Sequence, residues 1–232
     1  MSDYLYGKNS FVEALHGDRI KKAYVLKDSS FINDLKKRRI EYEIVDRRFL
    51  DKMSKSGNHQ GVLAEVKEYK IYDVDDLLKK ENGLIVVLDG LKDPHNLGAI
   101  IRTCECAGAD GIIYKKHNAV KLNDTVAKVA CGALEYVKVS EVTNLTNTLK
   151  KLKEKGYWIV GSDGSATTSY ADVDYNRNIV LVIGSEGEGI SRLVLEECDY
   201  VVSLPMKGKV NSLNASVAAG ILIYNAVKSR SC

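Results

Sequence analysis

The chain has 232 residues, of which 45% are hydrophobic and 28% are charged, a composition typical of a folded protein with a sizeable core and not of a disordered one. It contains no run of the roughly 18 apolar residues that a membrane-spanning helix needs and no basic-then-apolar segment at its start, so we expect a cytoplasmic protein without a membrane partner. The net charge of +3 arises in residues 1–70, where 15 Lys and Arg stand against 11 Asp and Glu; this surplus suits contacts with a phosphate backbone, and a solvated helix face explains it equally well.

The first third of the chain predicts a small α/β unit. The apolar spacing predicts helices at residues 11–15, 31–39 and 49–53 and strands at residues 22–26, 42–45 and 62–66, with a turn-rich loop at 55–61. A unit of about seventy residues lies near the lower limit for independent folding. We therefore predict a domain at residues 1–70, followed by an acidic linker at 71–82.

A longer and more regular pattern begins at residue 83. Apolar, β-branched runs predict strands at residues 84–88, 111–114, 157–161, 179–183 and 200–204, with helical segments between most of them. This alternation predicts an open parallel sheet in a second domain, residues 83–232, whose ligands bind beyond the carboxyl ends of the strands.

The first of three chemistry-bearing segments, residues 88–103, reads as a strand end, a loop and a helix. Asn96 is predicted to cap that helix, because its side-chain oxygen can accept a hydrogen bond from an early helical amide. Ile100, Ile101 and Cys104 share one face, so Arg102 is predicted to point away from the core. Taken alone, a solvated arginine is the better interpretation.

The second segment, Gly184-Ser185-Glu186-Gly187-Glu188-Gly189, follows a predicted buried strand. Its glycines have the reverse order of the dinucleotide fingerprint, so an oxidoreductase with a nicotinamide cofactor is the weakest hypothesis. Glycines let backbone amides approach a ligand closely, and two glutamates disfavour a phosphate group and favour a cationic or neutral ligand. A simple turn between strand and helix is the alternative.

The third segment, residues 205–220, places Ser212, Asn214 and Ser216 at the start of a predicted helix that is apolar nearly all round. Such a helix must be covered on several sides, either by its own sheet or by a second subunit. Ser212 alone is explained well as a helix cap.

The cysteines and histidines do not predict a metal site. The five cysteines lack paired C-x-x-C spacing and the four histidines are scattered, so we expect reduced cysteines and no bound metal.

Together the three segments resemble the SpoU (TrmH-like) group of SPOUT RNA 2′-O-ribose methyltransferases. The motifs that match in order and spacing are Asn96-Leu97-Gly98-Ala99-Ile100-Ile101-Arg102-Thr103, Gly184-Ser185-Glu186-Gly187-Glu188-Gly189 and Ser212-Leu213-Asn214-Ala215-Ser216. Residues 1–70 also resemble the substrate-binding domain of RlmB-type enzymes, which methylate a guanosine of large-subunit (23S) rRNA, through Leu5-Tyr6-Gly7-Lys8-Asn9-Ser10 and His59-Gln60-Gly61-Val62. The resemblance covers almost the whole chain.

The resemblance implies an enzyme that uses S-adenosyl-L-methionine to methylate a ribose 2′-hydroxyl, with a C-terminal trefoil knot in the sheet domain. It implies cofactor contacts at Gly184, Leu204 and Leu213, and catalytic positions at Arg102, Asn96, Glu186, Ser212 and Asn214. A guanidinium is almost never deprotonated in a protein. We therefore expect Arg102 to bind phosphate and stabilise the developing oxyanion, with Glu186 and Asn96 holding the guanidinium and with Ser212 and Asn214 positioning ribose and phosphate.

The same resemblance implies a homodimer that binds RNA, with 23S rRNA as the expected substrate and no role for DNA. A tRNA ribose methyltransferase is the alternative enzyme, because its catalytic domain would look the same. A non-catalytic RNA-binding protein is the alternative from another class, and failure to bind S-adenosyl-L-methionine even with RNA present would favour it.

Overall fold

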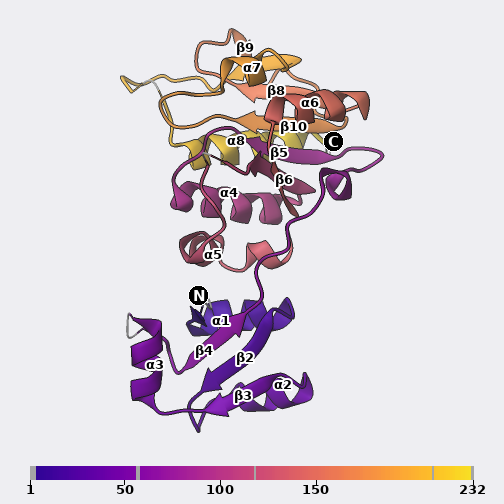
Figure 1. Ribbon diagram of the computed structural model, residues 1–232. Helices are drawn as coiled ribbons and strands as arrows, with labels where there is room; N and C mark the ends of the chain where they lie inside the picture. Colours follow the sequence, from indigo (N-terminus) through magenta and orange to yellow (C-terminus); the bar gives the residue numbers. More distant parts are fainter. Residues whose placement is uncertain (1–3, 56–57, 118, 211, 231–232) are drawn as a thin grey trace. The chain divides into compact units, whose positions relative to one another are not determined.

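The computed structural model describes residues 4–55, 58–117, 119–210 and 212–230, and it divides into two compact units, Met1–Tyr69 and Lys70–Cys232. Figure 1 traces the chain through both units. Part of the predicted loop at 55–61, residues 56 and 57, lies outside the described residues, as does Asn211 in the third motif segment.

The first unit is a four-stranded sheet with helices on both faces. The strands have the order β1-β4-β2-β3, with β2 parallel to β3 and antiparallel to β4, which also pairs antiparallel with β1. Phe11 and Leu15 of α1 and Leu35 of α2 pack against one face, while Leu50 of α3 packs with Tyr24 and Leu63 on the other. The elements are β1 (Tyr4–Tyr6), α1 (Lys8–His16), β2 (Ile20–Val25), α2 (Ile32–Lys37), β3 (Glu41–Ile44), α3 (Arg47–Ser54) and β4 (Val62–Val66).

The second unit is a seven-stranded sheet in which every neighbouring pair of strands is parallel, in the order β7-β6-β5-β10-β8-β11-β9. Its strands are β5 (Leu84–Leu88), β6 (Gly111–Lys115), β7 (Val139–Val142), β8 (Trp158–Ser162), β9 (Thr168–Ser169), β10 (Ile179–Ile183) and β11 (Tyr200–Ser203). Its helices are η1 (Val74–Leu77), α4 (Pro94–Ala107), α5 (Asp124–Ala130), η2 (Ala133–Glu135), α6 (Leu145–Glu154), α7 (Arg192–Leu195) and α8 (Ala215–Arg230). The predicted fold class, a small N-terminal α/β unit followed by a parallel-sheet unit, is confirmed. The trefoil knot stays a prediction.

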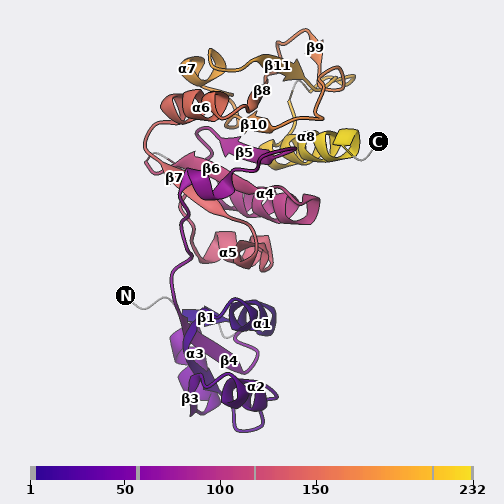
Figure 2. The same cartoon turned by 90° about the vertical axis from the view of Figure 1, so that its right-hand side faces the viewer.

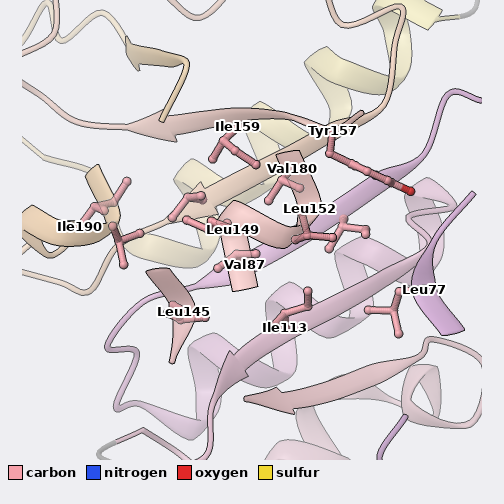
Figure 3. Packing of buried hydrophobic residues seen from close by; sticks show 13 residues of the cluster. Leu77, Val87, Ile113, Leu145, Leu149, Leu152, Tyr157, Ile159, Val180 and Ile190 are labelled. Atoms are coloured by element: carbon pink, nitrogen blue, oxygen red, sulfur yellow. The ribbon is translucent and has the colours of Figure 1, made fainter. Parts of the chain in front are cut away.

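Helices cover both faces of this sheet, which explains why its central strands β5 and β10 are buried at all five positions. Figure 2 shows α6 and α7 on one side of the sheet and α4 and α8 on the other. On the α6 side, alternate strand residues such as Val87, Ile113 and Val180 pack against Leu149 and Leu152 of α6 (Figure 3). The sheet is thereby held rigid, and the loops at the carboxyl ends of its strands start from fixed positions.

The predicted linker at 71–82 is packed onto the second unit. Leu77 is 1% exposed and belongs to the sheet core, and the Tyr72 amide donates to the carbonyl of Val139. An apolar residue in the middle of the acidic run, together with Asp73 capping η1, explains why this segment folds against the sheet.

The final helix α8 is tied to the start of the sheet at its far end. The Arg230 guanidinium donates to the carbonyls of Asn82, Gly83, Tyr175 and Arg177, at distances of 2.7 to 3.0 Å. Burial lowers the pKa of Arg230 from its usual value, but four carbonyl acceptors stabilise the charge. The C-terminal end of α8 is thus fixed against the residues that precede β5 and β10. The first turn of α8, at the other end of the helix, borders the loops described next.

Candidate functional site

The carboxyl edge of the second sheet carries a cavity of about 740 Å³. It is formed by the loops that follow β8, β10 and β11 and by the first turn of α8, as expected for ligand sites in parallel sheets. Gly184, Leu204 and Leu213, the three positions predicted to contact a cofactor, all line it. The full lining of described residues is Ser162, Asp163, Gly164, Ile183, Gly184, Ser185, Glu186, Gly187, Glu188, Gly189, Val202, Leu204, Met206, Ser212, Leu213, Asn214, Ala215 and Ala218.

The loop at 184–189 closes on itself over the end of β10. Ser185 and Gly189 exchange two backbone hydrogen bonds, at 3.0 and 3.1 Å, and Gly187 and Gly189 have φ values of 90° and 69° that glycine adopts without strain. A Cβ on Gly184 would lie 2.2 Å from the carbonyl carbon of Gly189. The closed shape of the loop therefore requires glycine at Gly184 and favours it at Gly187 and Gly189.

Glu186 connects the three motif segments. Its Oε1 accepts from Asn96 Nδ2 at 2.8 Å and from Asn214 Nδ2 at 2.7 Å, with the amide of Ala215 at 3.4 Å. Hydrogen bonds to an ionised carboxylate are stronger than those between neutral groups. One carboxylate oxygen thus joins the loop after β10 to the first turns of α4 and α8.

Two predicted caps are corrected by the structure. Asn96 was expected to cap α4, but Asp93 does so, accepting from the His95 amide at 2.9 Å, with Pro94 as the first helical residue. Proline is well suited to that position, so the helix begins earlier and the Asn96 side chain is free to bind Glu186. At α8 the cap is not Ser212: Asn214 Oδ1 accepts from the Ser216 amide at 2.9 Å.

Asn214 therefore has both ends of its side-chain amide bound within the chain. Its Nδ2 donates to Glu186, while its Oδ1 accepts from the amide and the hydroxyl of Ser216. This arrangement fixes the orientation of the Asn214 side-chain amide, so Asn214 helps to keep the wall of the cavity in place. Ser212 is exposed and lines the cavity.

Arg102 is exposed on α4, as predicted, but its predicted contacts differ from those observed. We expected Glu186 and Asn96 to hold the guanidinium; instead these two side chains bind each other, and Arg102 Nη1 lies 3.6 Å from Cys131 Sγ at the end of α5. Arg102 is also not among the described residues that line the cavity. Among the described residues, the polar contact of the Arg102 guanidinium is with this thiol and not with a carboxylate.

The cavity is acidic. Asp163, Glu186 and Glu188 line it, and none of its described lining residues is Lys, Arg or His. Hydrogen bonds from the Ser165 hydroxyl and amide lower the pKa of Asp163 below its usual value, which further favours the ionised carboxylate. The acidic lining favours a ligand with a positive charge over an anionic one; the sequence predicted a cationic or neutral ligand.

Two parts of the site were not predicted. The loop Ser162-Asp163-Gly164 lines the large cavity, and the rule that ligands bind beyond strand ends would have identified it after the predicted strand 157–161. A smaller cavity of about 210 Å³ lies between residues 90–96 and the loop at 184–189, and it shares Ser185, Glu186 and Glu188 with the larger one. Glu186 therefore borders both cavities.

The described residues contain neither a membrane-spanning helix nor a cluster of metal ligands. No helix within those residues has both the length and the apolar character needed to cross a membrane. Over the same part of the chain, there is no group of three or more His, Cys, Asp or Glu side chains arranged to hold a metal ion.

Curated relatives match nearly the whole chain. YacO of Bacillus subtilis (strain 168), whose name assigns it to the TrmH family of tRNA/rRNA methyltransferases, is 45% identical over 240 residues that cover 98% of this chain and 96% of the relative. A protein of Staphylococcus haemolyticus (strain JCSC1435) with the same family name is 40% identical over 97% of this chain and 95% of its own length.

Solved structures share the fold. The SpoU methyltransferase AviRb from Streptomyces viridochromogenes, in complex with the cofactor AdoMet, superposes with a TM-score of 0.86 at 25% identity and covers 98% of this chain and 90% of its own. The A. aeolicus TrmH/SpoU tRNA modifying enzyme is 34% identical and has a TM-score of 0.59, covering 68% of this chain and 80% of its own.

Family models match both units. The model described as RNA 2'-O ribose methyltransferase substrate binding matches residues 4–72, and the model of the SpoU rRNA Methylase family matches residues 83–224. The second match contains the closed loop, Glu186 and both of its asparagine partners. On the strength of these matches, the chain belongs to the SpoU rRNA Methylase family of TrmH-type RNA methyltransferases.

Proposed function

We propose that this protein transfers the methyl group of S-adenosyl-L-methionine to the ribose 2′-hydroxyl of a guanosine in 23S rRNA. The observation that carries the proposal is the composition of the large cavity: Asp163, Glu186 and Glu188 supply negative charge, and no basic side chain is among its described lining residues. A cationic ligand is favoured in such a cavity and an anionic one is repelled. The volume of about 740 Å³ lies within the range of small-molecule sites.

The residues present fit this cofactor. Its sulfonium carries a positive charge, which the carboxylates favour, and its adenosine has an apolar face for Ile183, Leu204 and Leu213. The closed glycine loop at 184–189 allows backbone amides to approach the ligand. When bound, the cofactor supplies an electrophilic methyl group. The AdoMet complex of AviRb supports this assignment.

Arg102 is proposed to act on the other reactant. A ribose hydroxyl is a weak nucleophile because its oxygen keeps its proton. As the methyl group is transferred and S-adenosylhomocysteine leaves, that proton passes to solvent water, and the chain must stabilise the negative charge that develops on the oxygen. A guanidinium keeps its own charge at every relevant pH, and its planar donors also suit the adjacent phosphate. Rates of methyl transfer by Arg102→Lys and Arg102→Ala across pH test this role: an Ala variant with near-wild-type single-turnover rates would remove Arg102 from catalysis.

Glu186 and its asparagine partners are proposed to preorganise the site. With Oε1 held by Asn96 and Asn214, Glu186 keeps the loop at 184–189 and the start of α8 at a fixed separation. Ser212 at the rim of the cavity is proposed to bind ribose or phosphate.

We propose that the active protein is a homodimer in which Arg102 of the partner subunit completes each site. Arg102 lies outside the lining of its own large cavity. The neighbouring helix α8 exposes an apolar stripe at i, i+4 and i+7, formed by Val217, Ile221 and Tyr224, which are 50%, 38% and 51% exposed. Gly220 of α8 packs beside Thr103, next to Arg102, so an interface on this stripe would bring the arginine to a second chain.

The N-terminal unit is proposed to bind the RNA. The substrate-binding family model matches it, and its excess of Lys and Arg suits phosphate contacts. Phosphate contacts do not read sequence, and the names of the relatives include both tRNA and rRNA, so the RNA class is decided by experiment.

Mapping ribose methylation in total RNA tests the proposal. RNA from cells that lack the protein is incubated with the full chain and S-adenosyl-L-methionine, and 2′-O-methylated nucleotides are mapped across all RNA species. We expect a single new site at a guanosine of 23S rRNA. A new methylated site in tRNA would show that tRNA, and not 23S rRNA, is the substrate. The absence of a new site from every RNA species would contradict the proposed activity.

A further inference from the structure

Asp89, the first residue after β5, holds both ends of the loop at 184–189. Its backbone amide donates to the carbonyl of Ile183, just before the loop, at 2.9 Å. Its carboxylate Oδ2 accepts from the amide of Ser191, just after the loop, at 2.8 Å. A single residue on the neighbouring strand thus fixes the points at which the loop leaves and rejoins the rest of the chain.

The carboxylate that makes this contact is buried, with 3% of the side chain exposed. A buried ionised carboxylate is costly unless it is paired and hydrogen-bonded. Here Oδ2 has the Ser191 amide, and Oδ1 lies 3.6 Å from Lys115 Nζ, which extends from the end of β6. The carboxylate thus joins the end of β5 to the end of β6 and to Ser191, the residue before α7.

Asp89 does not itself reach the ligand site. It is absent from the described residues that line either the large or the small cavity, whereas six consecutive residues of the loop that it holds, 184–189, line the large one. The position of Glu186, whose Oε1 must meet two asparagines within 2.8 Å, depends on that loop. We propose that Asp89 is a positioning residue for methyl transfer: it keeps the loop at 184–189 in the closed shape that binds the cofactor. This proposal rests on the proposed function.

The opposite end of β5 offers a matched control. Asp110 is 7% exposed, its Oδ2 accepts from the Leu84 amide at 2.7 Å, its own amide donates to the Leu84 carbonyl, and its Oδ1 pairs with Lys79. Both aspartates therefore bind a backbone amide and a lysine in the same sheet, but only Asp89 lies at the edge that carries the cavity. If both aspartates only stabilise the sheet, replacing either one is expected to have the same effect on cofactor binding and on the melting temperature.

The test measures binding of S-adenosyl-L-methionine and S-adenosylhomocysteine to the full chain by isothermal titration calorimetry, together with the melting temperature. We expect Asp89→Ala to raise Kd about tenfold or more, because a charge-assisted hydrogen bond that shapes the site is lost. Asp89→Asn keeps an oxygen acceptor for the Ser191 amide and is expected to restore Kd to within about threefold of wild type. Asp110→Ala is expected to lower the melting temperature while Kd stays within about twofold.

Equal changes in Kd for Asp89→Ala and Asp110→Ala would overturn the proposal, as would an unchanged Kd in Asp89→Ala or no rescue by Asp89→Asn. If Asp89→Ala does not fold, Lys115→Met and Lys79→Met are compared: the first is expected to weaken cofactor binding more than the second, and equal binding by both overturns the proposal. A wild-type protein that binds neither compound would instead refute the proposed function.

Discussion

Asn96 Nδ2 donates to Glu186 Oε1 at 2.8 Å, which joins two residues that lie 90 positions apart in the chain. Asn214 Nδ2 donates to the same oxygen at 2.7 Å. The contact explains why three separated motifs belong together: each supplies one member of a hydrogen-bonded set at the edge of the cavity.

Glu186→Ala is expected to reduce the single-turnover rate of methyl transfer by about a hundredfold, because both asparagines lose their shared acceptor and the loop loses its link to α8. Glu188→Ala is the comparison, since Glu188 lies in the same loop and does not accept from Asn96 or Asn214. The single-turnover rate of Glu188→Ala is expected to fall by much less than that of Glu186→Ala. Equal losses in the two variants would assign the effect to the acidity of the loop and not to the hydrogen bonds.

Mixed dimers of two inactive variants test whether Arg102 acts in the partner subunit's site. In a dimer of one Arg102→Ala chain and one Glu186→Ala chain, one site receives an intact cavity and an intact arginine only if the arginine crosses the interface. An equal mixture that exchanges subunits freely is expected to recover about a quarter of the wild-type rate, since about half of the dimers are mixed and each has one intact site. If Arg102 acts within its own chain, mixing restores nothing.

The apolar stripe on α8 predicts the oligomeric state. Tyr224→Glu is expected to convert the dimer to a monomer and to abolish activity, because a charge would be buried in the interface. Leu193→Glu on α7 is the control, since Leu193 is 55% exposed and Tyr224 is 51% exposed. Light scattering measures the molar mass of both variants, and Leu193→Glu is expected to remain a dimer. An active monomer of the wild-type protein at assay concentration would refute the proposed dimer.

Gly184→Ala is expected to abolish cofactor binding, because the added Cβ would lie 2.2 Å from the carbonyl carbon of Gly189 and would open the loop. Gly208→Ala is the control: Gly208 follows β11, and no described heavy atom outside its own neighbours lies within 4 Å of a Cβ built there. Calorimetry should show wild-type affinity for Gly208→Ala. Retained affinity in Gly184→Ala would mean that the closed loop is not needed for binding.

The sheet could be predicted from the sequence where strands are continuous and apolar. The runs at 84–88 and 179–183 have the predicted bounds, because β-branched residues buried on both faces leave an unambiguous signal. The strand at 62–66, which contains Glu65 and is only partly buried, also has its predicted bounds. Three strands were missed. β1 has three residues and β9 has two, and β7, Val139–Val142, has two adjacent polar residues between its valines, so each is too short or too mixed for a pattern to identify.

The location of the cavity could be predicted from the sequence, but the hydrogen bonds at its edge could not. The strand-end rule predicted a ligand site at this edge of the sheet, and the family resemblance assigned Gly184, Leu204 and Leu213 to it; all three line the same cavity. The partners of Glu186 depend on side-chain positions set by packing of the whole sheet, for which a local pattern carries no signal. The cap of α4 was available in the sequence: Asp93 followed by Pro94 is the commoner helix start, and it leaves Asn96 free.

The atom that receives the methyl group distinguishes ribose methylation from base methylation. RNA is incubated with the full chain and S-adenosyl-L-methionine carrying a labelled methyl group, hydrolysed completely with alkali, and separated by mass. A 2′-O-methyl group blocks alkaline cleavage of the adjoining phosphodiester. Methylation of a guanosine ribose therefore predicts label in alkali-resistant dinucleotides that contain guanosine. Label in single nucleotides, which places the methyl group on a base, would contradict it.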